Sequence, residues 1–520
     1  MSKPAKIPKP PDESDKRRML GSDYDPMGSL VELHPEQPKA SPSGKPKSQA
    51  AAMLALFEAH HGEAFLSLDD KPFFCVTEDG KRQTMTTSNV VKALSLWHFN
   101  QTGQAQAPTA RSREEVKNHL EALAEAGPKR QTWLRVAEHG GALYLDLGDE
   151  TWRAVRIASE GWDVIDCPPV YFVRPGAMLP LPVPVHGGNV AELFDLVNIP
   201  SGPDRALALA WLVSTLRPSR TFPILALHGE QGSAKSTTAE MLATVIDPHR
   251  AGVRIRPKDE ETVMVATQNA WVLAYDNLSS MPPWLSDLLC CLSTGGSHTA
   301  RTKYSDAGET VMSAERPLLL MSIEDIASRS DLLDRTIVLT LPTIPDHERR
   351  TKEQVWEGFR KAHPRILGAL LDAAAHALRT LPDVKPDALP RMADFALWAI
   401  AAEPALGLAD GEFLRAYSEN RKDAHGQALD ACPIVEPLER FMSGISEWTG
   451  TACELFAELN RKGSELQHAS PSWPKDGTRL SGQLRRIAPN LRSRGRLDIT
   501  HTKESGGQRK RLITIAKVAS

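Results

Sequence analysis

The sequence predicts an α/β fold in which a parallel sheet carries helices on both faces, with smaller domains before and after it. Residues 186–345 alternate helical segments with short apolar strands, the pattern of a parallel sheet with helical crossovers. The apolar run 222–228 leads directly into a glycine-containing loop and then a helical segment. Strand, loop and helix in this order are typical of a phosphate-binding site.

Composition divides the 520 residues into several domains. The first segment is rich in Pro, Lys and Ser and too poor in apolar residues to fold alone. A later segment is Ala- and Leu-rich with helical periodicity. The predicted plan is 1–50, a disordered basic, Pro-rich arm; 51–185, an α+β accessory domain; 186–345, the α/β core; 346–415, a helical lid; and 425–520, a winged helix.

Charge and cysteine content exclude several classes of protein. The formal net charge is −3, so any nucleic-acid footprint must be local. Six scattered cysteines without a CxxC pair favour neither a disulfide framework nor a zinc site. No apolar run is long enough to span a membrane, and no secretory signal is recognisable. We therefore expect a soluble, cytoplasmic protein without a membrane partner.

Two acidic residues in the accessory domain could suggest a metal-binding carboxylate pair. Asp146 and Asp149 lie within Leu-Asp-Leu-Gly-Asp-Glu, between two strand-like runs. Because Gly-Asp between strands is typical of a hairpin turn, we interpret them as turn residues. Primase activity in this chain is accordingly disfavoured.

The glycine-containing loop predicts a site for ATP and Mg²⁺. Backbone N–H groups of small residues surround phosphates at a helix N-terminus, a lysine neutralises the β and γ phosphates, and a hydroxyl binds Mg²⁺. Lys235 and Ser236 are the residues for these last two roles. Ala234 stands where the pattern has glycine, and its methyl group restricts the backbone. The predicted nucleotide-binding residues are Gly229, Glu230, Gln231, Gly232, Ser233, Ala234, Lys235, Ser236 and Thr237.

A second apolar strand, 271–275, ends in Asp276 and Asn277. Asp276 is the candidate Mg²⁺ ligand and Asn277 the candidate orienter of the attacking water. Many such ATPases have a carboxylate at the second position, and an amide cannot accept the proton of that water. A turn-forming role for this pair is the alternative.

A third apolar strand, 317–321, precedes the polar residue Ser322, a candidate γ-phosphate sensor, and then Arg329 and Arg335. Either arginine could supply positive charge to a neighbouring subunit's transition state. Each could equally form an ordinary surface ion pair. Between the second and third strands, an Asp-Ala-Gly turn predicts a hairpin that begins near Arg301.

The order GEQGSAKST, LAYDN, RTKYSD, RPLLLMSIED and SRSDLLDR resembles AAA+ helicases of superfamily 3 and phage-primase-associated ATPases. Similar proteins occur in bacterial prophages, plasmids and integrative elements. The resemblance implies a homo-oligomeric ring, typically a hexamer, whose hairpin contacts DNA in the channel. On this basis Arg301, Lys303 and Tyr304 are candidate DNA contacts, although each could instead brace the ring interface. A separate primase is an implied partner.

The C-terminal segment carries the local positive charge. Thr451 and Glu454 form a capping-box pattern at the start of one helix. A second helix, 480–491, has an apolar face and exposed arginines, and two strand-like runs follow it. From Arg479 onward there are eleven Lys or Arg and two acids. The candidate DNA contacts are Arg485, Arg486, Arg492, Arg509, Lys510 and Arg511, although winged helices that bind proteins also exist.

Three functional hypotheses follow from these motifs. The first is an ATP-dependent helicase or translocase that acts on single-stranded or forked DNA in replication of a mobile element. The second is an origin-binding initiator or loader ATPase without unwinding activity. The third is a DNA-binding nucleotide switch with little turnover, which Ala234 and Asn277 would favour.

Overall fold

The computed structural model describes residues 48–518 except 104–105, 201, 219–220, 279–280, 296, 302–308, 322–329, 471 and 504–510. For 297–301, 309–313, 330 and 493 it describes the backbone alone. No helix in the described ranges combines the length and the apolar content of a membrane span.

The first folded segment is an α+β unit with a sheet in the order β3-β2-β1-β4. Met53, Leu94 and Leu120 from its three helices are fully buried against this sheet. Helical patterns in the sequence predict helices over 51–61 and 114–126, and both are present. The second begins earlier than predicted, at Ala110, because the Thr109 hydroxyl caps it. The elements are α2 (Gln49–Ala59), β1 (Glu63–Ser67), β2 (Pro72–Glu78), β3 (Lys81–Thr86), α3 (Thr87–Gln101), α4 (Ala110–Ala126) and β4 (Lys129–Arg130).

An antiparallel sheet in the order β6-β7-β8-β9 follows. The alternating sequence pattern predicts one strand over 133–136, and this prediction is wrong. Arg135 has a φ of 63°, so one strand ends before it and another begins after it. The strands are β5 (Thr132–Trp133), which pairs with β10 (Tyr171–Phe172), and β6 (Val136–His139), β7 (Ala142–Asp146), β8 (Ala154–Ala158) and β9 (Gly161–Ile165).

The turn role predicted for Asp146 and Asp149 is confirmed. β7 and β8 are antiparallel neighbours, and the Asp146 carboxylate accepts a hydrogen bond from the Gly148 amide at 3.1 Å. Asp149 accepts one from the Arg153 amide, also at 3.1 Å. Both carboxylates are therefore committed to holding the connection between two strands.

The α/β core contains a fully parallel sheet in the order β12-β13-β16-β11-β17. Its central strands are short and apolar, as expected for strands covered on both faces. Successive residues alternate between two separate cores, so that Leu225 and Leu227 face one and Ile224 and Ala226 the other. The strands are β11 (Ile224–His228), β12 (Arg254–Ile255), β13 (Leu273–Asp276), β16 (Leu318–Met321) and β17 (Thr336–Thr340).

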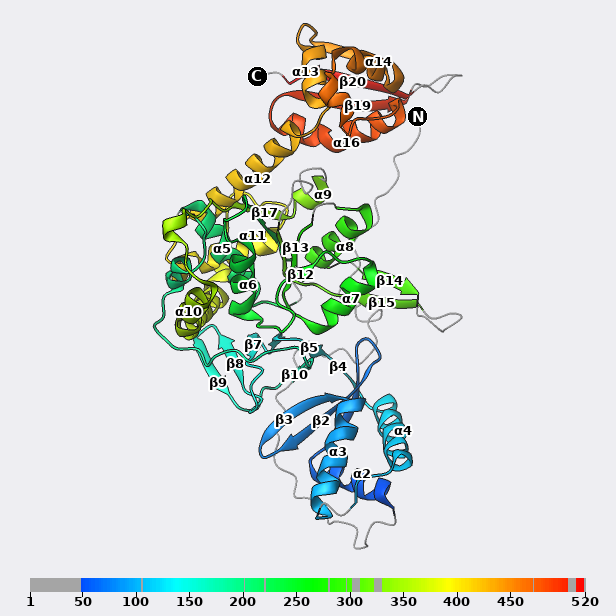
Figure 1. Cartoon of the computed structure of the whole chain (residues 1–520), viewed down its shortest axis with the longest axis vertical. Helices are drawn as coiled ribbons and strands as arrows, with labels where there is room; N and C mark the ends of the chain where they lie inside the picture. Colours follow the sequence, from blue (N-terminus) through cyan, green and yellow to red (C-terminus); the bar gives the residue numbers. More distant parts are fainter. Residues whose placement is uncertain are drawn as a thin grey trace, which may run out of the picture. The chain divides into compact units, whose positions relative to one another are not determined.

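The helices of the core divide between the two faces of the sheet. α5 (Pro203–Ser214) and α6 (Lys235–Ile246) share one hydrophobic core with one face. α7 (Glu260–Asn269), α8 (Pro283–Thr294) and α9 (Ser330–Leu333) share the other core with the opposite face (Figure 1). The helix after β11 therefore lies on the opposite face from the helix after its neighbour β16.

The expected hairpin before the third core strand is confirmed. β14 (Ser297–Arg301) and β15 (Glu309–Ser313) pair antiparallel, with Arg301 opposite Glu309. Arg301 ends the first strand rather than beginning it. Lys303 and Tyr304 lie outside the described residues.

Three helices follow the sheet: α10 (Lys352–Thr380), α11 (Ala393–Ala402) and α12 (Glu412–Asp430). α12 continues through Gly426, where the composition changes, and thus crosses the predicted start of the last domain. A Cβ atom at Gly426 would lie 1.8 Å from the Arg494 guanidinium. This glycine therefore allows close packing rather than ending the helix.

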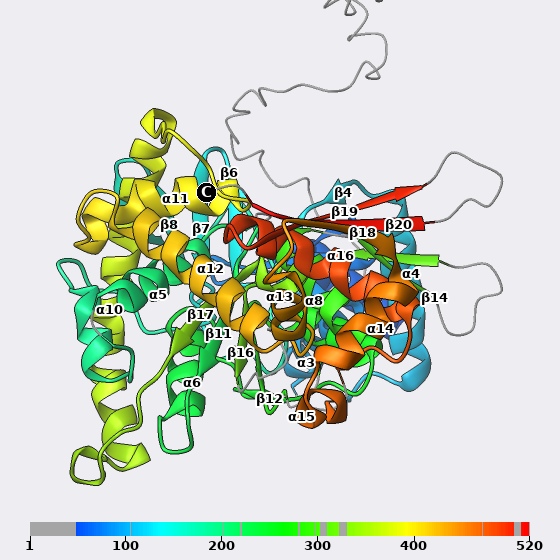
Figure 2. The same cartoon turned by 90° about the horizontal axis from the view of Figure 1, so that it is seen from above.

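The C-terminal segment has its own hydrophobic core and a sheet in the order β18-β20-β19 (Figure 2). The predicted capping box at Thr451 is confirmed, as are the amphipathic helix and the strand pair after it. The elements are α13 (Val435–Met442), β18 (Glu447–Thr451), α14 (Ala452–Lys462), α15 (Glu465–Ala469), α16 (Gly477–Ser493), β19 (Leu497–Lys503) and β20 (Arg511–Lys517).

Candidate nucleotide-binding site

The loop between β11 and α6 needs glycine at two positions. Gly229 has a φ of 152°, and a Cβ atom there would lie 2.7 Å from the Leu341 carbonyl oxygen. Gly232 has a φ of 89°, a backbone angle that residues other than glycine rarely adopt. The loop can therefore curl tightly before the helix begins.

Ala234 adopts the left-handed conformation that the sequence pattern normally gives to glycine. Its φ is 57° and its ψ is 28°, immediately before α6 begins at Lys235. This conformation costs an L-residue about 1–2 kcal/mol. The methyl group therefore strains the loop without changing its path.

The Lys235 ammonium group points back into the loop. Its Nζ donates to the carbonyl oxygens of Gly229 and Glu230, the second at 2.8 Å. Burial, and then the positive charge of Lys235, lower the pKa of His228 at the end of β11. His228 is therefore neutral near pH 7 and adds no charge of its own.

Asn198, which the sequence analysis did not single out, ties the loop to its surroundings. Its Nδ2 donates to the Ser233 carbonyl at 3.0 Å and to the Pro342 carbonyl at 2.6 Å. Ser233 is buried, and its hydroxyl donates to the Glu230 carbonyl at 2.8 Å. The shape of the loop is thus fixed from within and from one side.

Ser236 and Asp276 meet although forty positions separate them. The Ser236 hydroxyl donates to Oδ2 of Asp276 at 2.8 Å. Asn277 has a φ of 56°, and its amide donates to the other carboxylate oxygen at 2.7 Å. A hydroxyl and a carboxylate side by side are the hard oxygen ligands that Mg²⁺ uses beside nucleotide phosphates.

The loop lies at a reversal in the topology of the sheet. β11 and β16 are adjacent and parallel, and the helices that follow them lie on opposite faces. In open α/β sheets the crevice beyond the carboxyl ends of two such strands is the usual ligand site. The fold therefore presents this loop where a ligand can enter.

Arg349 is a second residue at the loop that sequence reasoning missed. Its Nη2 atom lies 3.1 Å from the position that a Cβ atom on Gly232 would take. Its side chain is 53% exposed and pairs with Asp346 at 3.0 Å. A basic residue after the last core strand carries no motif, so only the fold brings it to the loop.

A buried ion pair links the antiparallel sheet to the α/β core near this site. Arg135 is fully buried, and its Nε donates to Oδ1 of Asp247 at 2.9 Å. The other oxygen of Asp247 accepts from the amides of Trp271 at 2.7 Å and Val272 at 3.1 Å. Asp247 thus connects the end of α6 to the residues just before β13, which carries Asp276.

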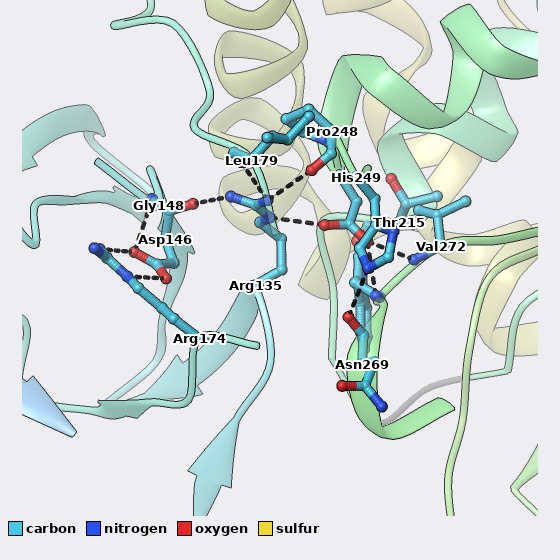
Figure 3. A network of polar contacts seen from close by, with 12 residues as sticks. Arg135, Asp146, Gly148, Arg174, Leu179, Thr215, Pro248, His249, Asn269 and Val272 are labelled. Atoms are coloured by element: carbon cyan, nitrogen blue, oxygen red, sulfur yellow. Dashed lines mark hydrogen bonds and ion pairs between the residues drawn. The ribbon is translucent and has the colours of Figure 1, made fainter. Parts of the chain in front are cut away.

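The remaining guanidinium nitrogens of Arg135 are also bonded (Figure 3). They donate to the carbonyl oxygens of Asp146 at 3.0 Å, Leu179 at 2.8 Å and Pro248 at 3.3 Å. The guanidinium is therefore surrounded by acceptors, as a buried charge requires. No motif signals this network, because its members lie far apart in the sequence.

Arg335, the one candidate arginine of the third strand region that the structure describes, is bonded to a neighbouring residue of its own chain. Arg335 donates to the Asp331 carbonyl at 2.7 Å. Burial raises the pKa of the Cys290 thiol of α8, and the nearby charge of Arg335 offsets part of that rise. Arg329 and Ser322 lie outside the described residues. The structure thus places Arg335 beside α8 and α9 within its own chain.

Basic residues of the C-terminal segment lie on two neighbouring elements. Arg485, Arg486 and Arg492 are exposed on α16, whose opposite face is buried. Arg492 pairs with Asp498 of β19. Arg511 begins β20 opposite Lys503, whereas Arg509 and Lys510 lie outside the described residues.

Two family models match the chain, one over residues 190–424 and one over residues 434–520. The first describes the actinomycete integrative conjugative element replication protein, and the second the C-terminal domain of the same protein, RepA. Together they cover more than half of the chain. The chain belongs to this RepA family. The match supports a role in the replication of an integrative conjugative element, and it confirms the mobile-element part of the predicted resemblance.

Solved structures of the NrS-1 C-terminal region are also similar to this RepA-family chain. One apo structure is 13% identical, with a TM-score of 0.35, covering 90% of this chain and 99% of its own. Another is 13% identical, with a TM-score of 0.35, covering 91% and 100%. Similarity at this level is too weak to assign a function. No curated protein matches.

Proposed function

We propose that this RepA-family chain is an ATP-dependent DNA helicase or translocase that replicates its element as a homo-oligomeric ring. The observation that carries the proposal is the hydrogen bond from Ser236 to Asp276 at the edge of the glycine loop. It joins the helix that follows the loop to the strand that ends in a carboxylate. That pairing is how P-loop ATPases hold Mg²⁺ and nucleotide phosphates together.

The residues at the loop fit MgATP. The amides from Gly229 to Thr237 would surround the phosphates, Lys235 would offset their charge, and Ser236 with Asp276 would bind Mg²⁺. The bound ion would supply charge neutralisation at the γ-phosphate. Arg335 or Arg329 would act on the site of the neighbouring subunit. We assign the core to the AAA+ class on the motif order together with this sheet.

We further propose that the C-terminal segment is a DNA-binding winged helix. Helix α13, strand β18, helices α14 and α16, and the strand pair β19–β20 follow in this order, and β18 pairs with β20. The exposed Arg485 and Arg486 lie on α16, and Lys503 and Arg511 lie side by side on the strand pair. This arrangement offers positive charge from a helix and a hairpin together.

Asn277 favours a second candidate function, the DNA-binding nucleotide switch. Its side-chain amide cannot accept a proton from water, and its own backbone amide is bonded to Asp276. An ATPase without a carboxylate at this position would bind ATP and turn over slowly. The initiator or loader would hydrolyse ATP without unwinding DNA, so its activity would lie between those of the helicase and the switch.

One experiment separates the three functions. ATP hydrolysis and displacement of a labelled strand from a forked duplex are measured for the wild type, Lys235→Ala and Lys361→Ala, with and without single-stranded DNA. Lys361 is an exposed lysine of α10 that pairs with Glu357, and it serves as the charge control. DNA-stimulated hydrolysis with displacement, lost only in Lys235→Ala, is the expected result. Hydrolysis without displacement supports the initiator, and binding without hydrolysis supports the switch.

A further inference from the structure

A cavity of about 500 Å³ lies at the β12 edge of the parallel sheet, beside β13. It is bounded by the edge strand β12, the connection that follows it, and α7. Cavities of this size suit small ligands or single residues of a larger one. Its lining residues are Arg254, Ile255, Arg256, Pro257, Lys258, Thr262, Val265, Ala266, Asn269 and Tyr275.

This lining combines apolar surface with cationic groups. Three of the ten residues are Arg or Lys, and none is Asp or Glu. Ile255 is 81% exposed and Val265 is 55% exposed, so large apolar side chains reach solvent at the cavity. Positive charge beside exposed apolar surface fits a ligand that carries both a planar apolar part and a phosphate.

Tyr275 adds a polar group that has no partner. Its side chain is 2% exposed, and its buried hydroxyl makes no hydrogen bond within the described part of the chain. A phenol hydroxyl can both donate and accept a hydrogen bond. An unsatisfied buried hydroxyl is costly, and a ligand with polar edges would remove that cost.

Arg254 lies next to this hydroxyl in the sheet. β12 and β13 pair in parallel, with Arg254 opposite Tyr275 and Ile255 opposite Asp276. Burial lowers the pKa of the Arg254 guanidinium, which the nearby Tyr275 raises in turn. The cavity therefore begins one residue away from the carboxylate that we assign to Mg²⁺.

We propose that this cavity binds one nucleotide of a single DNA strand, with the base against Tyr275 and Val265 and the phosphates on Arg254 and Lys258. The proposal rests on the proposed function, because it assigns the path of the strand in a DNA-dependent ATPase. Tyr275 and Asp276 are consecutive in β13, so a nucleotide in the cavity would lie against the strand that carries the proposed Mg²⁺ ligand. This provides a route by which DNA stimulates hydrolysis.

Three substitutions in the full chain test the site. Val265→Trp fills the cavity from an exposed position, Tyr275→Phe removes only the unpartnered hydroxyl, and Lys258→Ala removes one charge. Lys385→Ala is the control for an exposed lysine remote in sequence. Binding of fluorescent oligothymidylate is measured across a salt series, and an oligomer carrying 5-iododeoxyuridine is photocrosslinked and mapped by mass spectrometry.

We expect Val265→Trp to weaken binding about tenfold, because the indole would occupy the space of the base and one bound base contributes about that much. Tyr275→Phe should weaken it about threefold to tenfold without changing the salt slope. Lys258→Ala should lower that slope by about 0.7. The crosslink should map to a peptide that contains Tyr275 and disappear in Val265→Trp.

Several results would overturn the site. Crosslinks confined to other peptides would do so, as would displacement of the crosslink by free thymidine monophosphate as readily as by oligomer. A change in oligomeric state in Val265→Trp with unchanged DNA binding would assign the surface to a neighbouring subunit instead. Loss of ATP hydrolysis with the crosslink retained would refute the proposed function and leave the site standing.

Discussion

Replacing Arg135 with Met should destabilise the junction between the antiparallel sheet and the nucleotide site. The substitution keeps much of the side-chain volume but removes the charge that faces Asp247 at 2.9 Å. Both partners are essentially inaccessible to solvent, with 0% and 1% exposure. The Asp247 carboxylate would then keep its two backbone amide donors and the nearby charges of Arg316 and Arg254, but no side-chain hydrogen bond from Arg135.

The expected magnitude follows from what is left without a partner. Removing one member of a buried ion pair typically costs about 3–5 kcal/mol, because the remaining charge is uncompensated. The amides of Trp271 and Val272 still stabilise the Asp247 carboxylate. The carbonyl oxygens that Arg135 bonds would also lose a donor. We therefore expect a loss of about 3 kcal/mol.

The most direct assay is hydrogen exchange of the backbone amides of Trp271 and Val272, which donate to Asp247. A loss of about 3 kcal/mol would speed exchange of a peptide covering 270–273 more than about a hundredfold, if local opening controls it. Arg153→Met is the matched control in the same sheet, because Arg153 pairs with Asp149 at 2.8 Å but remains 32% exposed. Such partly exposed pairs contribute about 1 kcal/mol or less.

A double variant checks the cause. Arg135→Met with Asp247→Asn removes both charges, and its cost should fall short of the sum of the single costs by about 2 kcal/mol. If Arg135→Met exchanges like Arg153→Met, or if the two substitutions are additive, the pair does not hold α6 and β13 together. The hydrogen-bond network in Figure 3 would then not stabilise the position of β13 at the site.

Three further perturbations have defined outcomes. Ala234→Gly relieves about 1–2 kcal/mol of left-handed backbone strain but costs about 0.4–1 kcal/mol, because glycine raises the entropy of the unfolded chain. The thermal midpoint of unfolding should therefore stay the same or rise slightly. A marked fall would contradict the left-handed loop conformation. Arg349→Ala should weaken binding of a fluorescent ATP analogue about tenfold at unchanged thermal midpoint, because it removes a charge beside Gly232, and unchanged affinity would exclude that role. Burial lowers the pKa of His363 to about 4, despite its hydrogen bond with the Val245 carbonyl. The folded state therefore binds a proton at His363 less readily than the unfolded state does. The free energy of unfolding should be highest above about pH 6.5 and should fall by at most about 3 kcal/mol as the pH drops to about 4. Denaturant titrations should show that His363→Gln lacks this loss.

Local signals made the central strands and the loop predictable. The apolar run before Gly229 and the run before Asp276 are short, periodic and bounded by turn residues, so their structure follows from nearby sequence. The capping box at Thr451 is equally local. These features depend on residues within one turn or one strand of each other, which is why the sequence alone indicates them.

Long-range packing was not predictable in the same way. Arg135 and Asp247 are far apart in the sequence, and neither belongs to a repeating pattern. The left-handed backbone at Arg135 also interrupts a strand that periodicity alone would continue. Asn198 and Arg349 reach the loop for the same reason, since only the completed sheet brings their segments to it.

Gly426 lies at a change in composition, near the predicted start of the last domain, yet it does not end a helix. Glycine near a change in composition suggests a boundary, because it destabilises a helix by about 1 kcal/mol relative to Ala. In the structure α12 continues through it, and the Arg494 guanidinium occupies the space of a side chain and donates to the Lys422 carbonyl at 2.7 Å. The requirement comes from a segment about seventy positions later, so composition cannot reveal it.

The C-terminal segment offers an internal control for DNA binding. Arg485 and Arg492 are both exposed on α16, but Arg492 forms an ion pair with Asp498. Among the described residues, a phosphate must therefore compete with a carboxylate for Arg492 and not for Arg485.

We expect Arg485→Ala to weaken binding of double-stranded DNA and to lower the salt slope by about 0.9, the value for one released phosphate contact. Arg492→Ala should change the slope by less, because its charge is already offset. Fluorescence anisotropy across a salt series measures both. Equal slopes for Arg485→Ala and the wild type would remove Arg485 from the DNA interface. A larger change in Arg492→Ala would instead show that DNA displaces Asp498 and uses the end of the helix.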